Sequence, residues 1–215
     1  MLFRGHGNAY RLFGHSVYTF SLVFLFSMSG VYHLLEPGGV ARMTLQRLDH
    51  AGIYVLIAGT FTAVHFTFFN RKKRWIISTF VWILSITGLV LTVIFMKNMP
   101  QLLLSAFYLG LGWIGIFTGY FLYSNYGFNT FRPLLLGGCV YSIGAIIMYL
   151  DWPVLWPGVI QAHEIFHVAV IIAAYTHWKL VYQWSANPSS HRLTFIVRKE
   201  AQINFSQKPL LKNFL

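Results

Sequence analysis

Six apolar runs dominate this sequence, and each is long enough to cross a lipid bilayer as a helix. The hydrocarbon core of a bilayer is about 30 Å thick and takes roughly 20 helical residues to span. Breakers such as EPGG at 36–39, NRKKR at 70–74 and DWPVLWPG at 151–158 separate the runs. The spans that we predict are residues 12–35, 50–69, 75–96, 101–123, 133–150 and 160–184.

The composition agrees with an integral membrane protein. The chain is 56% hydrophobic and only 10% charged, whereas a soluble domain has about 25% charged residues. Too few polar side chains are present to cover a water-facing globule. We therefore expect an all-α, polytopic membrane helical bundle, with a single domain over residues 1–184 and a basic polar tail over 185–215.

The net charge of +11 comes from Lys and Arg residues that lie in short runs between the apolar segments. No nucleic-acid-binding motif accompanies the basic residues, so we expect membrane lipids as partners and no nucleic acid. All of the 16 Lys and Arg residues except Arg42, Arg47 and Lys97 fall on one side of the predicted bundle. The positive-inside rule then predicts a multi-pass plasma-membrane protein with both termini in the cytoplasm.

The stretch QAHEIFH at 161–167 contains H-E-x-x-H, a pattern typical of zinc metalloproteases when it lies on a helix. Two histidines on adjacent turns supply only two of the three protein ligands that catalytic zinc usually has. The extended form of the soluble motif needs a histidine at position 173, which is Ala173. An intramembrane metalloprotease needs an aspartate in a later span, and none follows Asp151. Because neither of these third metal ligands is present, the sequence disfavours a protease.

The predicted topology offers a different third ligand. The first span ends at SMSGVYH, which places His33 near the extracytoplasmic face, where the last span begins with His163 and His167. These three histidines would form a three-nitrogen metal site with an open position. Asp49, at the same depth where the second helix begins with QRLDHAGIY, would orient or deprotonate water, and Ser29 would hydrogen-bond nearby. A structural polar cluster between helices is the alternative.

Three motifs together resemble one family. They are S-x-x-x-H at 29–33, L-D-H-x-x-I-Y-x-x-I-x-G-T at 48–60 and H-x-x-x-H at 163–167. In this order they resemble bacterial hemolysin III-like proteins of the progestin and adipoQ receptor family, within a superfamily that includes alkaline ceramidases. The resemblance covers roughly residues 16–178. It implies zinc as the metal at the three histidines, and a lipid or lipid amide as the substrate class.

The chain departs from the usual family pattern in the number of its helices. The family usually has seven spanning helices, and the residues before His15 are too few for the first of them. We expect either a six-helix variant or a true start that lies upstream. The family pattern is H-x-x-x-H, without a strict glutamate, so we assign the general base to Asp49, or to the zinc-bound water that it contacts, and not to Glu164.

The leading functional hypothesis is a zinc-dependent hydrolase of the bacterial inner membrane that cleaves an amide or ester bond in a lipid. A non-enzymatic alternative is a lipid-sensing or receptor-like protein in which zinc holds helices together. The name hemolysin points to a third hypothesis, a pore-forming cytolysin, but no polar stripe follows any of the predicted helices.

Overall fold

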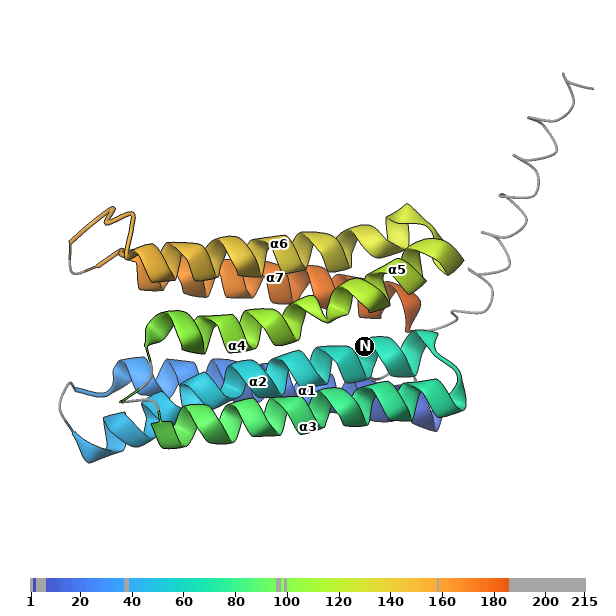
Figure 1. Ribbon diagram of the computed structural model, residues 1–215, viewed down its shortest axis with the longest axis horizontal. Helices are drawn as coiled ribbons and strands as arrows, with labels where there is room; N and C mark the ends of the chain where they lie inside the picture. The colour runs from blue at the N-terminus through green and yellow to red at the C-terminus, as the bar shows by residue number, and fades with distance from the viewer. Residues whose placement is uncertain are drawn as a thin grey trace, which may run out of the picture.

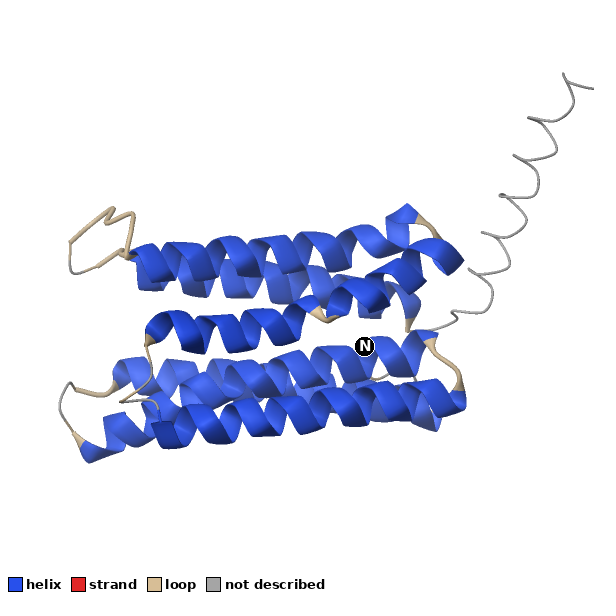
Figure 2. Cartoon of the chain, viewed as in Figure 1, coloured by secondary structure: helices blue, strands red, loops and turns tan. Residues whose placement is uncertain are grey.

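The computed structural model describes residues 2, 7–36, 39–95, 98, 100–157 and 159–185. Within these residues all regular structure is helical, apart from one isolated bridge between Trp156 and Ile160 (Figure 2). The predicted all-α fold is confirmed. The helices are α1 (Ala9–Leu34), α2 (Val40–Phe68), α3 (Arg71–Phe95), α4 (Gln101–Trp113), α5 (Gly115–Tyr126), α6 (Phe128–Leu150) and α7 (Ala162–Trp184).

The described helices form six segments that are long and apolar enough to cross a membrane, because α4 and α5 together make one span. The spans alternate in direction, which gives the bundle two ends (Figure 1). We call the end where α1 finishes and α7 starts the histidine end. The opposite end, where α2 finishes and α3 starts, is the basic end. Residues 186–215 of the predicted tail lie outside the described residues.

Helix α2 is the most enclosed span. The bundle has one layer of α1, α2 and α3, another of α6 and α7, and α4 with α5 between them (Figure 1). In α2, 83% of the apolar 18-residue stretch that could span the membrane is buried inside the bundle. Small residues let neighbouring helices approach a helix closely in a bilayer. The small buried residues of α2 include Ala51, Gly52, Ala58, Gly59 and Ala63.

Two of the differences from the predicted spans change the structure around the cavities. Helix α2 begins at Val40, about three turns before the apolar run, because the polar residues that follow Gly39 continue the helix without a breaker. The fourth predicted span is interrupted at Ile114. Gly112 and Gly115 flank this interruption, and a glycine inside a helix costs about 1 kcal/mol relative to alanine.

Hydrogen bonds between helices fix their relative depth. The Tyr18 hydroxyl on α1 donates to the Ala174 carbonyl on α7 at 3.1 Å. Between α2 and α3, the Trp82 indole donates to the Thr62 hydroxyl at 3.0 Å. Such bonds contribute about 0.6 to 2 kcal/mol each in membranes. The bond from Tyr18 is the important one for the site, because α1 and α7 carry the histidines at the histidine end.

Gly59 is the point where α2 approaches α1, and it gives a stability prediction. A Cβ atom added at Gly59 would overlap the Ser21 hydroxyl and would lie 2.8 Å from Ser21 Cβ. We expect Gly59→Ala to destabilise the bundle by about 1–3 kcal/mol, as over-packing does in a filled core. Gly138→Ala is the matched control, because a Cβ there meets nothing within 4 Å. Thermal unfolding in detergent measures the difference, and equal midpoints for the two variants would contradict this packing.

Candidate metal site and lipid cavity

Three histidines converge at the histidine end of the bundle. His33 lies in the last turn of α1, and His163 and His167 lie in the first two turns of α7. The Nε2 atom of His33 is 3.0 Å from that of His163 and 3.1 Å from that of His167. The His163 and His167 Nε2 atoms are 3.0 Å apart. All three nitrogens therefore surround one point.

This arrangement suits a metal ion better than it suits hydrogen bonds. A ring nitrogen offers either one proton or one lone pair, so three Nε2 atoms that lie within 3.1 Å of one another cannot all be paired by hydrogen bonds. Tetrahedral zinc at about 2.0–2.1 Å from each nitrogen would place its ligands roughly 3.3 Å apart, close to the observed spacing. The group of His33, His163 and His167 could thus hold a metal ion.

The start of α7 explains why a glutamate lies between the two histidines. Glu164 Oε2 accepts a hydrogen bond from the Gln161 backbone N–H at 2.9 Å, and the Gln161 side chain completes a capping box. Such a box satisfies backbone donors that the first helical turn leaves unpaired. Glu164 is exposed, and its carboxylate takes part in this capping hydrogen bond. It therefore stabilises the first turn of α7.

Asp49 and Ser29 line the same polar cavity as the three histidines. Both are buried, with 7% and 9% of their surfaces exposed. The structure thus brings all five predicted site residues to one cavity, although α1, α2 and α7 contribute them separately.

The cavity also contains polar residues that the sequence prediction missed. Arg42 and Gln46 lie one turn apart on α2 and line it with His50. The Arg42 guanidinium stacks over the Tyr32 ring at 4.8 Å and donates to the Leu35 carbonyl. The spacing of Arg42, Gln46 and Asp49 was the available signal, since positions i, i+4 and i+7 share one helix face.

Two other membrane histidines are not part of this site. His65 Nε2 lies 3.0 Å from the Thr118 hydroxyl and so connects α2 to α5. His177 Nε2 lies 3.2 Å from the Leu134 carbonyl and connects α7 to α6. These histidines have the ordinary role of polar residues between membrane helices.

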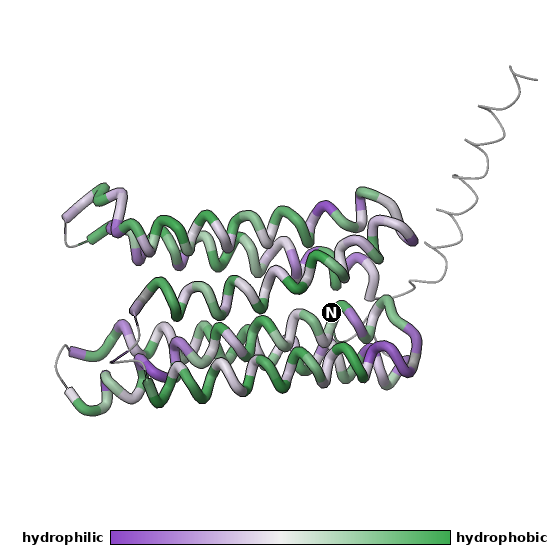
Figure 3. The backbone as a smooth tube through the Cα atoms, in the orientation of Figure 1, coloured by the Kyte–Doolittle hydropathy of each residue, from purple (hydrophilic) through white to green (hydrophobic). Residues whose placement is uncertain are grey.

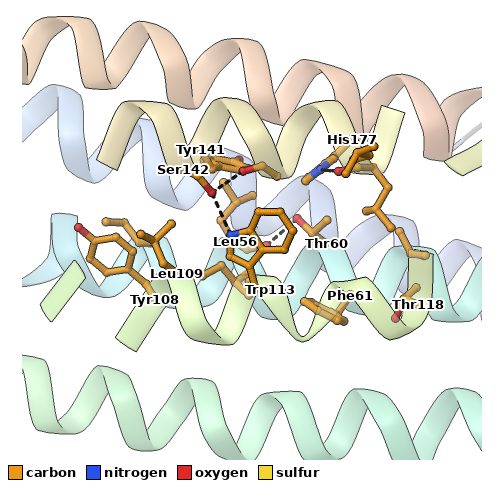
Figure 4. Close-up of a pocket in the computed structure, with 18 of the residues that line it drawn as sticks. Leu56, Thr60, Phe61, Tyr108, Leu109, Trp113, Thr118, Tyr141, Ser142 and His177 are labelled. Atoms are coloured by element: carbon orange, nitrogen blue, oxygen red, sulfur yellow. Dashed lines mark hydrogen bonds between the residues drawn. The ribbon is translucent and has the colours of Figure 1, made fainter. Parts of the chain in front are cut away.

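An apolar cavity continues from the polar one. The two share Leu25, Ile53, Tyr108, Phe166 and Val170 among their linings. From there the apolar cavity runs between α2, α4, α6 and α7 as far as Thr118 and His177 (Figure 4). Beside it, the Trp113 indole donates to the Ser142 hydroxyl at 2.9 Å and links α4 to α6 (Figure 4). The histidine group therefore lies next to a space of lipid-like polarity.

Comparison with known proteins identifies the family. The family model described as Haemolysin-III related matches residues 4–178. The chain belongs to this family. It is 30% identical to Hemolysin-3 of Bacillus cereus over 166 residues, which cover 77% of this chain and 72% of that protein. The family assignment made from the three motifs is confirmed, and with it a multi-pass membrane protein that has bacterial relatives.

Animal members of the wider group are also similar. The chain is 27% identical to Progestin and adipoQ receptor-like protein 1 of Caenorhabditis elegans, over 73% of this chain and 40% of that protein. It is 30% identical to the Adiponectin receptor protein of Drosophila melanogaster, over 70% of this chain and 37% of that protein. The resemblance to the progestin and adipoQ receptor family is thus confirmed from the sequence of the membrane region.

Proposed function

We propose that this haemolysin III-related protein is a zinc-dependent hydrolase that cleaves an amide or ester bond in a membrane lipid. The observation that carries the proposal is the convergence of the His33, His163 and His167 Nε2 atoms at 3.0–3.1 Å beside a buried carboxylate. Their spacing and their three-nitrogen donor set fit zinc. A buried carboxylate in the same cavity as these histidines is more than a purely structural zinc site needs.

The residues of this chain then have separate roles in the reaction. When bound, zinc would supply Lewis acidity toward a carbonyl oxygen and toward water. Asp49 accepts a proton from the attacking water and returns it to the leaving nitrogen or oxygen. The water oxygen becomes bonded to the carbonyl carbon as the C–N or C–O bond breaks. Ser29 hydrogen-bonds to the reacting groups from the first helix.

The two adjoining cavities indicate how a lipid substrate would lie. An acyl chain fits the apolar cavity, where water is excluded and burial of methylene groups is favourable. The polar headgroup then lies among Arg42, Gln46 and the histidines. The distribution of Lys and Arg supports a location in the bacterial inner membrane, with both termini cytoplasmic and the site toward the extracytoplasmic leaflet.

Metal analysis combined with a lipid assay tests the proposal. We expect about one zinc per purified chain, and release of fatty acid from ceramide or phospholipid vesicles that stops after chelation and resumes when zinc is restored. A protein without zinc would refute the site. A protein with zinc that releases no fatty acid from these lipids would favour the lipid-sensing alternative, in which the metal only ties α1 to α7.

A further inference from the structure

The basic end of the bundle contains an arginine that the proposed hydrolase does not use. Helix α3 begins with the sequence RKKR, and Arg74 closes its first turn. The Arg74 guanidinium carbon lies 4.8 Å from the centre of the Tyr10 ring on α1 and 5.8 Å from the centre of the Phe66 ring on α2. Arg74 is therefore held where three helices meet, whereas Lys72 and Lys73 are exposed.

The positive charge of Arg74 is poorly compensated by the protein. Its Nε atom is buried and has no hydrogen-bond partner among the described residues. The first turn of α3 contains no acidic residue, although the positive end of a helix dipole favours an anion there. Burial of an unpaired donor is unfavourable, and more so for a charged group.

No carboxylate of the described chain can supply the missing anion. The protein has five acidic residues. Four of them lie toward the histidine end: Glu36 after α1, Asp151 after α6, Glu164 in α7, and Asp49 in the polar cavity. Glu200 lies outside the described residues. The strongly hydrophilic segment at the start of α3 thus has no acidic neighbour at its own end among the residues that the structure describes (Figure 3).

An aromatic surface adjoins Arg74 and faces outward from the bundle. The Phe13 ring lies 5.3 Å from the Phe66 ring and 5.8 Å from the Trp75 ring. Phe13 and Trp75 are each nearly half exposed, at 46% and 45%. They lie at the point where two membrane spans begin, and aromatic rings favour this interfacial depth. A ligand with an anionic head and an apolar tail matches both parts of this surface.

We propose that Arg74 binds the phosphate group of an anionic phospholipid, whose chains lie against Phe13 and Trp75. Arginine is suited to this role because its planar guanidinium both donates to phosphate oxygens in a fixed geometry and stacks on aromatic rings. The positive-inside rule accounts for exposed lysines in a loop. It does not require an arginine inserted between Tyr10 and Phe66.

Lipid binding to the purified full-length chain tests this inference. The probes are dioleoylphosphatidylglycerol and dioleoylphosphatidylcholine, added to the protein in detergent, with bound lipid counted by native mass spectrometry. We expect one phosphatidylglycerol to be retained, and Arg74→Gln to weaken its binding by about tenfold or more, as loss of a charge-assisted contact does. Lys73→Gln is the matched control: it removes the same charge from an exposed neighbour and should weaken binding much less.

Further arms of the experiment distinguish a specific lipid site from general surface attraction and from a site for free phosphate. If Arg74→Gln and Lys73→Gln lose phosphatidylglycerol binding equally, the attraction is general and the site is overturned. The same follows if phosphatidylcholine is retained as well as phosphatidylglycerol. Inorganic phosphate that displaces the lipid at matched concentration would overturn the lipid assignment. If Arg74→Gln does not fold, Arg74→Lys replaces it, because lysine keeps the charge but loses the planar contacts. Binding to Arg74→Lys as tight as that to the wild type would then refute the proposal.

Discussion

Replacement of His167 by alanine is expected to reduce the zinc content of the purified protein from about one per chain to nearly none. The variant keeps two imidazoles, and two protein nitrogens are fewer than the three that open zinc sites usually have. Loss of a residue that only supports a ligand weakens metal binding by about 10–100-fold, so we expect loss of a ligand itself to exceed that range. Elemental analysis and zinc titration against a competing chelator measure the change.

Substitutions of other histidines in the cavity test whether zinc loss is specific to the three-histidine group. His33→Ala should lose zinc to a similar extent, although His33 lies on α1, 134 residues before His167. His50→Gln is the control, because His50 lines the same cavity but lies outside the three-histidine group, and its Nδ1 faces the Gln46 carbonyl at 2.9 Å. Undiminished zinc in His33→Ala would show that α1 contributes no ligand.

Asp49→Asn is expected to keep the zinc and to lose lipid hydrolysis. The amide has nearly the same shape as the carboxylate but cannot accept a proton from water, and general-base catalysis typically contributes about 10²- to 10⁴-fold. The rate of fatty-acid release under saturating lipid should fall by a factor in this range. Metal analysis of the same preparation checks that the zinc remains.

Glu164→Gln is the matched variant for this comparison. It makes the same change from carboxylate to amide within the helical turn that joins His163 to His167, but its side-chain oxygen can still accept from the Gln161 N–H. We expect little change in hydrolysis. A greater loss in Glu164→Gln than in Asp49→Asn would reverse the assignment of the base. Hydrolysis that is unaffected in Asp49→Asn would remove Asp49 from the reaction.

The general fold was predictable because the bilayer restricts the choice so strongly. Six apolar runs of sufficient length leave little besides a helical bundle, and alternation of direction then groups His33 with His163 and His167 at one end. The depth of these residues follows from counting along each helix. The meeting of their nitrogens around one point does not follow, because it depends on the rotation of α1 and α7 about their axes.

Arg42 and Gln46 were missed because the start of α2 was predicted too late in the sequence. Hydropathy marks where a helix is apolar, not where its backbone hydrogen bonds begin, so the ten residues before His50 were left outside the predicted span. With α2 starting at Val40, Arg42 and Gln46 fall on the face of Asp49 and enter the cavity. The interruption at Ile114 was hidden for a similar reason, since glycine does not reduce hydropathy enough to divide an apolar run.

The distance along the chain between His33 and His163, 130 residues, has a consequence for biogenesis. A ribosome adds about 5–20 residues each second, so α1 emerges and inserts roughly ten seconds before the start of α7 exists. During that interval the nascent chain presents a single imidazole from this group. The ligand cluster is thus the last part of the bundle to assemble, and a chain truncated before α7 cannot form it.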